Sequence, residues 1–177
     1  MKKTKNIVIT ALFAGLITVF TAYICHVPFG TSGGYIHFGD ALIYLGATVL
    51  PLPFAVLAAA IGGGLADLLT APMWVLPTVI IKAMLCLPFA IVKRSKDKNG
   101  KYTLKALLCT GLGALITVAG YYLAEVIMVS DFIVPLASLP FNCIQALGSI
   151  VIFVLISYSL EKTGVMRKLF GFNIDKK

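Results

Sequence analysis

Charged side chains are scarce in this chain of 177 residues. They make up 12% of the composition, whereas hydrophobic residues make up 59%. A soluble domain of this size needs a more polar surface than this composition can supply. The scarcity of charge therefore excludes an ordinary water-soluble protein and indicates a membrane protein.

Motifs for ATP binding and for zinc-dependent hydrolysis are also missing. The phosphate-binding pattern GxxxxGK[ST] and the zinc pair HExxH do not occur in the sequence. The glycine-rich residues 61–64 lie inside an apolar run, where glycine allows helices to pack closely. We expect no ATPase activity in the chain itself, no catalytic residues, no cofactor and no metal site.

Paired cysteines are absent as well. The four cysteines lie in four different hydrophobic segments and form no CxxC pair, so that neither a metal site nor a disulfide framework is indicated. We expect all four to be small, buried, apolar residues. They are Cys25, Cys86, Cys109 and Cys143.

The apolar residues that are present come in long runs. Several runs reach the roughly 20 residues that a helix needs to cross a hydrocarbon core of about 30 Å. Membrane-spanning strands would alternate and be about 10 residues long, which does not fit. The sequence predicts an all-α integral membrane protein, a single domain 1–177 with six transmembrane helices. The approximate spans are 7–25, 40–52, 53–71, 74–92, 106–129 and 133–160.

The first run also has the basic start of a signal peptide. It is longer than a typical signal core, and five more runs follow it, so we interpret residues 7–25 as the first span.

Basic residues predict the orientation of the chain. Apart from Lys82, they lie at the N-terminus, in the loop 93–105 and near the C-terminus. Short loops rich in Lys and Arg stay in the cytoplasm, so all three regions are predicted to be cytoplasmic. The net charge of +8 is thus a topology signal, and no nucleic-acid partner is needed to explain it.

An even number of crossings must then separate the N-terminus from the loop 93–105. The apolar segment 41–71 is broken by Pro51 and Pro53. One kinked helix would place the basic loop outside, whereas two short spans or a re-entrant hairpin keep it inside. We favour two short spans, and the connections 25–39, 70–74 and 130–134 then face outward.

Polar side chains within the spans predict a binding site. Ionisable residues in a membrane are costly and usually functional. A rise of about 1.5 Å per residue places all of them in the outer half of the membrane, as a pocket open to the outside requires. Nearby aromatic residues could stack on a flat ring whose edge the polar groups bind. The candidate binding residues are Tyr35, His37, Asp40, Asp67, Trp74, Lys82, Tyr121, Glu125, Asn142 and Gln145.

Several of these residues also have a purely structural interpretation. Asp40 follows a glycine at the start of an apolar run, so it fits a helix N-cap with His37 beside it. Lys82 and Asp67 fit an ion pair between neighbouring helices. Asn142 and Gln145 fit interhelical hydrogen bonds, and Trp74 fits an aromatic residue at the membrane interface.

Small residues in the first span form a possible helix contact. Ala11 and Gly15 have small-xxx-small spacing, and Ala14 lies beside them. This patch either packs against another span of the same chain or forms a bare face for the helix of a partner.

The stretches "GGYIHFGDALIYLGA", "AAAIGGGLADLL" and "IIKAM" resemble the substrate-binding S components of energy-coupling factor (ECF) vitamin transporters, in the riboflavin- and hydroxymethylpyrimidine-type branch. The resemblance covers nearly the whole chain. It implies a multi-pass protein of a bacterial plasma membrane that binds a vitamin or vitamin precursor from outside, a compact pyrimidine, pyridine or flavin ring.

By the same resemblance, the chain associates with a transmembrane coupling protein and two ATPase subunits. Ala11, Ala14 and Gly15 would meet the coupling protein. The stretch "TSGGYIHFGD" would be a lid over the pocket, with Gly30, Gly33 and Gly34 letting it open and close.

Two other functions stay open on the sequence. One is an intramembrane enzyme that acts on a lipid or isoprenoid with Asp67, Lys82 and Glu125 as acid and base groups. The other is a scaffold or assembly factor, for which the outer polar cluster would have no role.

Overall fold

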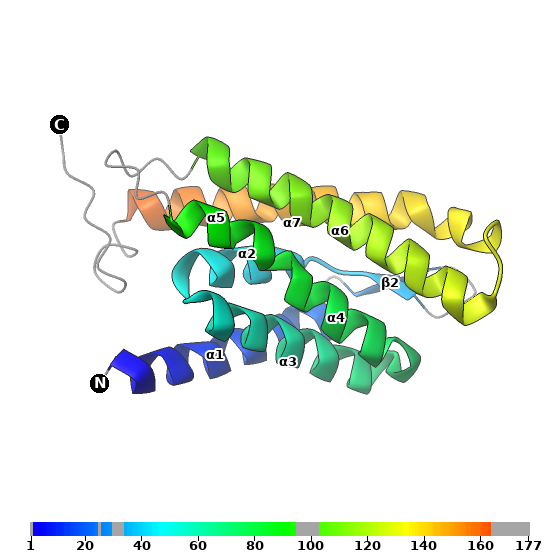
Figure 1. Ribbon diagram of the computed structural model, residues 1–177, viewed down its shortest axis with the longest axis horizontal. Helices are drawn as coiled ribbons and strands as arrows, with labels where there is room; N and C mark the ends of the chain where they lie inside the picture. Colours follow the sequence, from blue (N-terminus) through cyan, green and yellow to red (C-terminus); the bar gives the residue numbers. More distant parts are fainter. Residues whose placement is uncertain (1, 25, 30–33, 95–102, 164–177) are drawn as a thin grey trace.

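The computed structural model describes residues 2–24, 26–29, 34–94 and 103–163. They form an elongated bundle of helices with a two-stranded hairpin near one end (Figure 1). Most of the predicted loop 93–105, together with Cys25, Gly30 and Gly33, lies outside the described residues. In chain order the elements are α1 (Lys2–Ala22), β1 (Val27–Phe29), β2 (Gly34–Ile36), α2 (Asp40–Val49), α3 (Leu52–Thr70), η1 (Pro72–Trp74), α4 (Val75–Leu85), α5 (Leu87–Arg94), α6 (Thr103–Val129), η2 (Val134–Ser138) and α7 (Leu139–Lys162).

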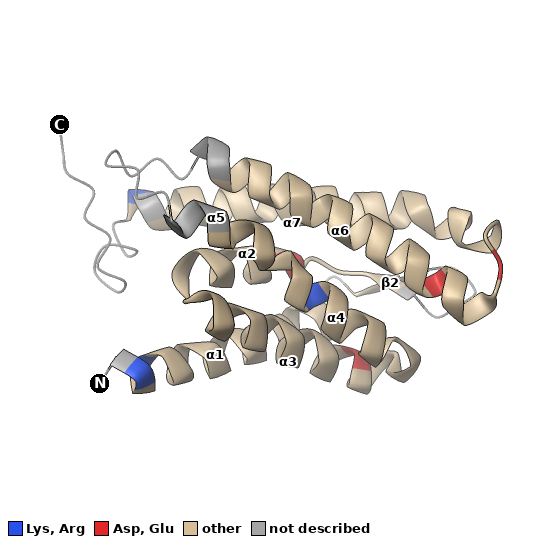
Figure 2. Ribbon diagram, viewed as in Figure 1, with Lys and Arg blue, Asp and Glu red and all other residues tan. Residues whose placement is uncertain are grey.

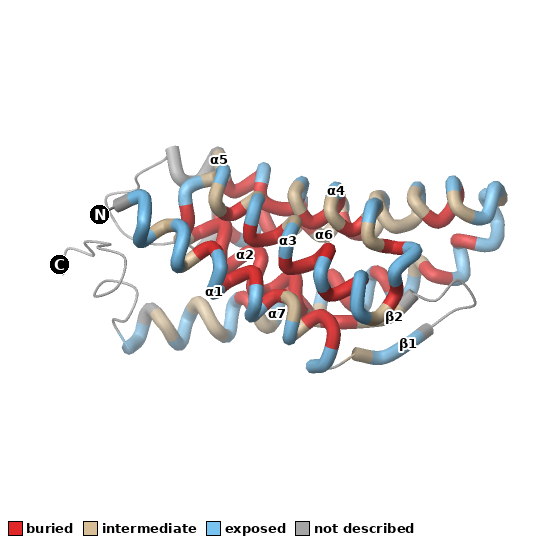
Figure 3. The backbone as a smooth tube through the Cα atoms, turned by 90° about the horizontal axis from the view of Figure 1, so that it is seen from below, coloured by how far each residue is buried: buried red, intermediate tan, exposed pale blue. Residues whose placement is uncertain are grey.

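The structure confirms the predicted all-α membrane protein. Within the described chain, five helices are long and apolar enough to cross a membrane, and α2 is a shorter apolar helix. Buried residues run through the interior of the bundle (Figure 3), while large apolar side chains such as Leu76 and Ile127 are exposed. Apolar side chains outside and polar ones inside suit a lipid environment. The number of crossings and the side on which the termini lie stay predictions.

The proline-containing segment is divided into two helices rather than forming one kinked helix. α2 stops before Leu50, whose backbone is extended (φ −86°, ψ 151°), because a residue that precedes proline disfavours the helical conformation. Pro53 lies in the first turn of α3, where its missing N–H breaks no intrahelical hydrogen bond. The turn between α2 and α3 therefore follows directly from Pro51 and Pro53.

The short helix α2 is extended by the chain that precedes it. Its 10 residues span about 15 Å, and residues 34–38 add up to about 16 Å. Together they match a hydrocarbon core of about 30 Å, which α2 alone does not. His37 and Gly39 are buried between helices, as non-helical backbone at membrane depth must be.

The two ends of the bundle differ in charge. We call the end with the β1–β2 hairpin and the α3–α4 and α6–α7 connections the hairpin end, and the opposite end, where α1 begins and α7 ends, the terminus end (Figure 1). Apart from Lys82 of α4, the described lysines lie in the first turns of α1 and the last turn of α7, whereas carboxylates near the ends of α3 and α6 lie toward the hairpin end (Figure 2). This asymmetry is the one from which the cytoplasmic termini are predicted.

The half of the bundle toward the terminus end contains an apolar core around α2. The ring of Tyr44 is fully buried and lies 5.6 Å from the ring of Phe89 and 6.0 Å from that of Phe153. Phe89 and Phe153 also contact each other, at 6.2 Å. These rings join α2, α5 and α7 without hydrogen bonds between their side chains, so this half is held mainly by packing.

One of the cysteine predictions is wrong. Cys86 and Cys109 are buried as expected, but Cys143 is exposed. It lies on α7 between two buried polar residues, Asn142 and Gln145, and the turn of the helix places it on the outer face. The small size of a cysteine does not indicate which face of a helix it occupies.

The prediction that glycines allow close helix packing is confirmed at several positions. A Cβ atom on Gly62 would lie 2.8 Å from the carbonyl oxygen of Ala14 in α1, and one on Gly113 would lie 2.7 Å from the ring of Tyr44. Gly111, two residues from Gly113 on the same helix, has no such neighbour within 4 Å. Glycine is thus required at some of these positions but not at all of them.

Gly113→Ala and Gly111→Ala form a matched pair that tests this packing. We expect Gly113→Ala to lower the melting temperature of the purified protein in detergent, because overpacking a buried ring costs about 1–3 kcal/mol. Gly111→Ala should leave it unchanged or raise it, since alanine favours a helix by about 1 kcal/mol. Equal melting temperatures for the two variants would contradict the close contact with Tyr44.

Candidate functional site

A buried ion pair lies at the centre of the polar cluster. The ammonium of Lys82 in α4 lies 2.6 Å from the carboxylate of Asp40 at the start of α2, and neither side chain is exposed. Gly63 in α3 makes room for the lysine, because a Cβ atom there would lie 2.8 Å from Lys82 Cγ. The absence of a side chain on α3 thus lets a long cationic side chain pass between helices.

Other side chains surround both charges. Thr117 Oγ1 in α6 donates to the second carboxylate oxygen of Asp40 at 3.5 Å. Lys82 Nζ lies 5.1 Å from the ring centre of Tyr121 and 3.4 Å from His37 Nε2. The pair therefore joins α2, α4 and α6 to the chain just before α2.

Two structural interpretations of these residues are wrong. Asp40 does not cap α2, because Gly39 holds the N-cap position and no side chain caps the helix. Lys82 pairs with Asp40 rather than with Asp67. Both differences have one cause, namely that the extended chain before α2 places Asp40 deep in the bundle beside α4.

His37 fixes the extended chain to α2 and α7. Its Nδ1 accepts a hydrogen bond from the backbone N–H of Gly39 at 3.0 Å, and its own backbone N–H donates to Gln145 Oε1 at 3.3 Å. Because Nδ1 accepts this bond, it carries no proton, and the imidazole adds no cation to the cluster.

Tyr35 joins the hairpin to α3. Its hydroxyl donates a hydrogen bond to the buried carboxylate of Asp67. Its ring stacks on His26 with centres 4.0 Å apart, and lies 5.5 Å from the ring of His37. The hairpin is thus attached to the bundle by one hydrogen bond to a buried carboxyl group and by ring contacts.

A second aromatic contact joins α6 to the connection between α3 and α4. The ring of Trp74 meets that of Tyr121 edge-on, with centres 5.8 Å apart, and the Tyr121 hydroxyl lies 3.0 Å from Thr78 Oγ1. Trp74 is buried, so its ring faces the other helices rather than lipid.

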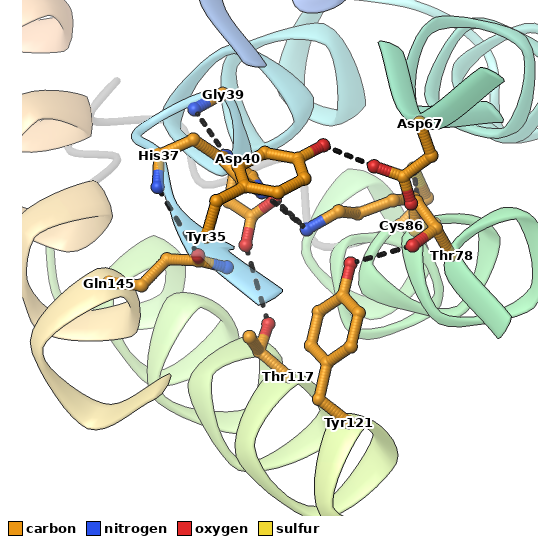
Figure 4. A network of polar contacts seen from close by, with 11 residues as sticks. Tyr35, His37, Gly39, Asp40, Asp67, Thr78, Cys86, Thr117, Tyr121 and Gln145 are labelled. Carbon is orange, nitrogen blue, oxygen red and sulfur yellow. Dashed lines mark hydrogen bonds and ion pairs between the residues drawn. The ribbon is translucent and has the colours of Figure 1, made fainter. Parts of the chain in front are cut away.

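Most of the predicted binding residues form one contact network (Figure 4). Glu125 in α6 and Asn142 in α7 are also buried. Because Lys82 and Asn142 are both buried, neither side chain faces lipid. In the described chain no group of three or more His, Cys, Asp and Glu residues is placed to hold a metal ion. The residues that the network joins are Tyr35, His37, Asp40, Asp67, Trp74, Lys82, Tyr121 and Gln145.

Sequence reasoning missed two threonines and one glycine of this network. Thr78 lies four residues before Lys82, and Thr117 lies four residues before Tyr121, so each shares a helix face with a predicted residue. The four-residue spacing from a predicted binding residue could therefore have identified both threonines. Gly63, which admits Lys82, could not be distinguished from its glycine neighbours by sequence.

The small-residue patch of α1 is divided between two faces. Ala11 and Gly15 are exposed, and a Cβ atom on Gly15 would meet nothing within 4 Å. Ala14 is buried, and its carbonyl oxygen lies under Gly62 of α3. A role for Ala11, Ala14 and Gly15 in binding a partner stays a prediction.

Comparison with known proteins identifies a family that this chain matches. Residues 1–162 match the sequence profile of a family described as "ECF-type riboflavin transporter, S component". The chain is also 31% identical over 101 residues, 57% of its own length, to a protein of Pyrococcus woesei described as "Uncharacterized protein in gap 3'region". The match spans 66% of that relative's length.

Substitution of each member of the ion pair tests its structural role. We expect Asp40→Asn and Lys82→Met each to destabilise the protein by about 3–5 kcal/mol, because each leaves a buried charge without its partner. The double variant should lose less than either single variant, since both charges are gone. Thermal unfolding in detergent measures the three effects, and additive losses would show that the two side chains do not interact.

Proposed function

The chain belongs to the S-component family of ECF-type riboflavin transporters, and we therefore propose that it is the membrane-embedded, substrate-binding subunit of a vitamin importer. The polar and aromatic network at the hairpin end carries this proposal. Charged and amide side chains of α2, α4 and α7 meet aromatic side chains of β2 and α6 at one level of the bundle. A binding site for a small polar ring needs this combination.

The proposed substrate is a ring-bearing vitamin or vitamin precursor. The family description names riboflavin, and a flavin is one of the rings that the aromatic residues would suit. Tyr35, Trp74 and Tyr121 would stack on the ring, while Asn142 and Gln145 would bond to its edge. His37, Asp40, Asp67, Lys82 and Glu125 complete the proposed site.

The proposed delivery to the cytoplasm depends on other proteins. The chain has no ATP-binding motif, so uptake would need a transmembrane coupling protein and two ATPase subunits. The exposed Ala11 and Gly15 on α1 would meet the coupling protein, with Ala14 behind them. The hairpin would cover the site, held by the bond between Tyr35 and Asp67.

The alternative, an intramembrane enzyme that acts on a lipid or isoprenoid, is less well supported. It assigns Lys82 to acid or base chemistry, but Lys82 is fully buried and already bonded to Asp40. A transporter subunit needs no such reactive group.

The first test is ligand binding by the purified protein. Trp74 is the single tryptophan of the chain and contacts Tyr121, so its fluorescence reports on the site. We expect riboflavin or a pyrimidine or pyridine vitamin to quench it at micromolar concentration or below, without ATP.

Gln145→Leu should weaken binding about tenfold, the equivalent of one hydrogen bond of about 1.4 kcal/mol. Leu147→Ala, on the exposed face of the same helix, is the control and should bind normally. If no vitamin binds, the proposed function is wrong.

The second test separates binding from transport. Gly15→Leu adds a large side chain where nothing lies within 4 Å, so the fold and ligand binding should be unchanged. Vitamin uptake in cells that also produce the coupling protein and ATPases should fall at least tenfold, because the added side chain blocks close approach of a partner helix. Gly111→Leu, at a second open position on α6, should leave uptake normal. Equal uptake by both variants would show that α1 is not the contact face.

A further inference from the structure

The distribution of charge at the hairpin end bears on which ligands the proposed site can accept. We propose that the site selects its ligand by charge, accepting a neutral or cationic ring and excluding one that carries a carboxylate or phosphate. This inference rests on the proposed function and names the chemical class of its substrate.

No lysine or arginine outside the ion pair is available to an anionic ligand at the hairpin end. The sequence has no Lys or Arg in residues 6–81, 83–92 or 106–161, so every connection at the hairpin end lacks them. His37 Nδ1 accepts a hydrogen bond from the backbone N–H of Gly39, so that nitrogen carries no proton and the imidazole is not a cation. Lys82 is therefore the one lysine or arginine at this depth.

Lys82 is already neutralised. Its ammonium lies 2.6 Å from Asp40, and both side chains are completely buried. A ligand carboxylate that took this ammonium would leave Asp40 as a buried charge without a counter-ion, which is strongly unfavourable. The ion pair thus gives a ligand a neutral surface rather than a positive one.

Carboxylates outnumber ammonium groups around the network. Asp67 accepts a hydrogen bond from Tyr35 of the network, and Glu125 lies one helical turn beyond Tyr121 on α6. Both are buried, so with Asp40 they make three acidic side chains against one basic side chain. An anion brought from water would lose its hydration and find the one ammonium already paired with Asp40. A ring N–H or an amine could instead donate to a carboxyl oxygen of an acidic side chain. The arrangement therefore disfavours anions and favours hydrogen-bond donors.

Matched ligand pairs test the charge rule on the intact protein. The first pair is riboflavin and riboflavin 5′-phosphate, and the second is nicotinamide and nicotinate, which have nearly the same size. We expect the neutral member of any pair that binds to bind at least tenfold more tightly, measured by quenching of Trp74. Equal or tighter binding of the anion overturns the inference while the proposed function stands. If no member of either pair binds and a wider panel of vitamins also fails, both are wrong.

Substitutions test whether charge or shape excludes an anionic ligand. Asp40→Asn removes the counter-ion of Lys82. It should reduce the ratio of affinities for the neutral and the anionic ligand at least tenfold. Asp67→Asn removes one carboxylate but keeps an oxygen that can accept from Tyr35, so it should narrow the difference even if Asp40→Asn does not fold. Asp131→Asn is the control, because Asp131 lies at the same end but is bonded to the backbone N–H groups of Ile133 and Val134 outside the network. The inference is overturned if Asp67→Asn, and Asp40→Asn where it folds, keep the wild-type ratio of affinities for the neutral and the anionic ligand. That result would show that shape, and not charge, excludes the anion.

Discussion

A charged side chain in the interior of a membrane protein must be neutralised by the protein itself, and here Lys82 and Asp40 neutralise each other. The arrangement of the hairpin end depends on this pair. It requires that the chain before α2 enter the bundle, because Asp40 has to reach the level of Lys82. It also requires the glycine of α3 that leaves space for the lysine stem. The hydrogen bonds of His37 and the ring of Tyr121 then form around a centre whose net charge is zero.

The remainder of the fold supports this centre in two ways. At the terminus end, the rings of Tyr44, Phe89 and Phe153 hold α2 in place by packing alone. At the hairpin end, contacts are mostly polar, and they connect β2 to α3 and the chain before α2 to α7. An apolar half that is held by packing thus carries a half that is held mostly by polar contacts.

Much of this structure could be predicted from the sequence, for identifiable reasons. Long apolar runs gave the membrane class and the helices, Pro51 and Pro53 gave the break after α2, and the stretch with His37 and Asp40 pointed to the family. The partners of the charged side chains could not be predicted. Asp40 looked like a helix cap because local sequence contains no information on how far an extended segment descends between helices. The partner of Lys82 depends on that descent, so Asp67 appeared equally suitable. Exposure of Cys143 depends on the rotation of α7, which a uniformly apolar helix does not encode.

The non-helical backbone of residues 34–38 has a consequence for biogenesis. Such a segment does not satisfy its own backbone groups, and its pairing with β1 is limited to residues 34–36, so it cannot remain in lipid on its own. Asp40 likewise has no counter-ion until α4, more than 30 residues later, has been synthesised. Membrane insertion of this chain therefore cannot proceed strictly one helix at a time from the N-terminus. We expect the ribosome-bound intermediate to keep α2 within the insertion machinery until the arrival of α4 allows both to leave together.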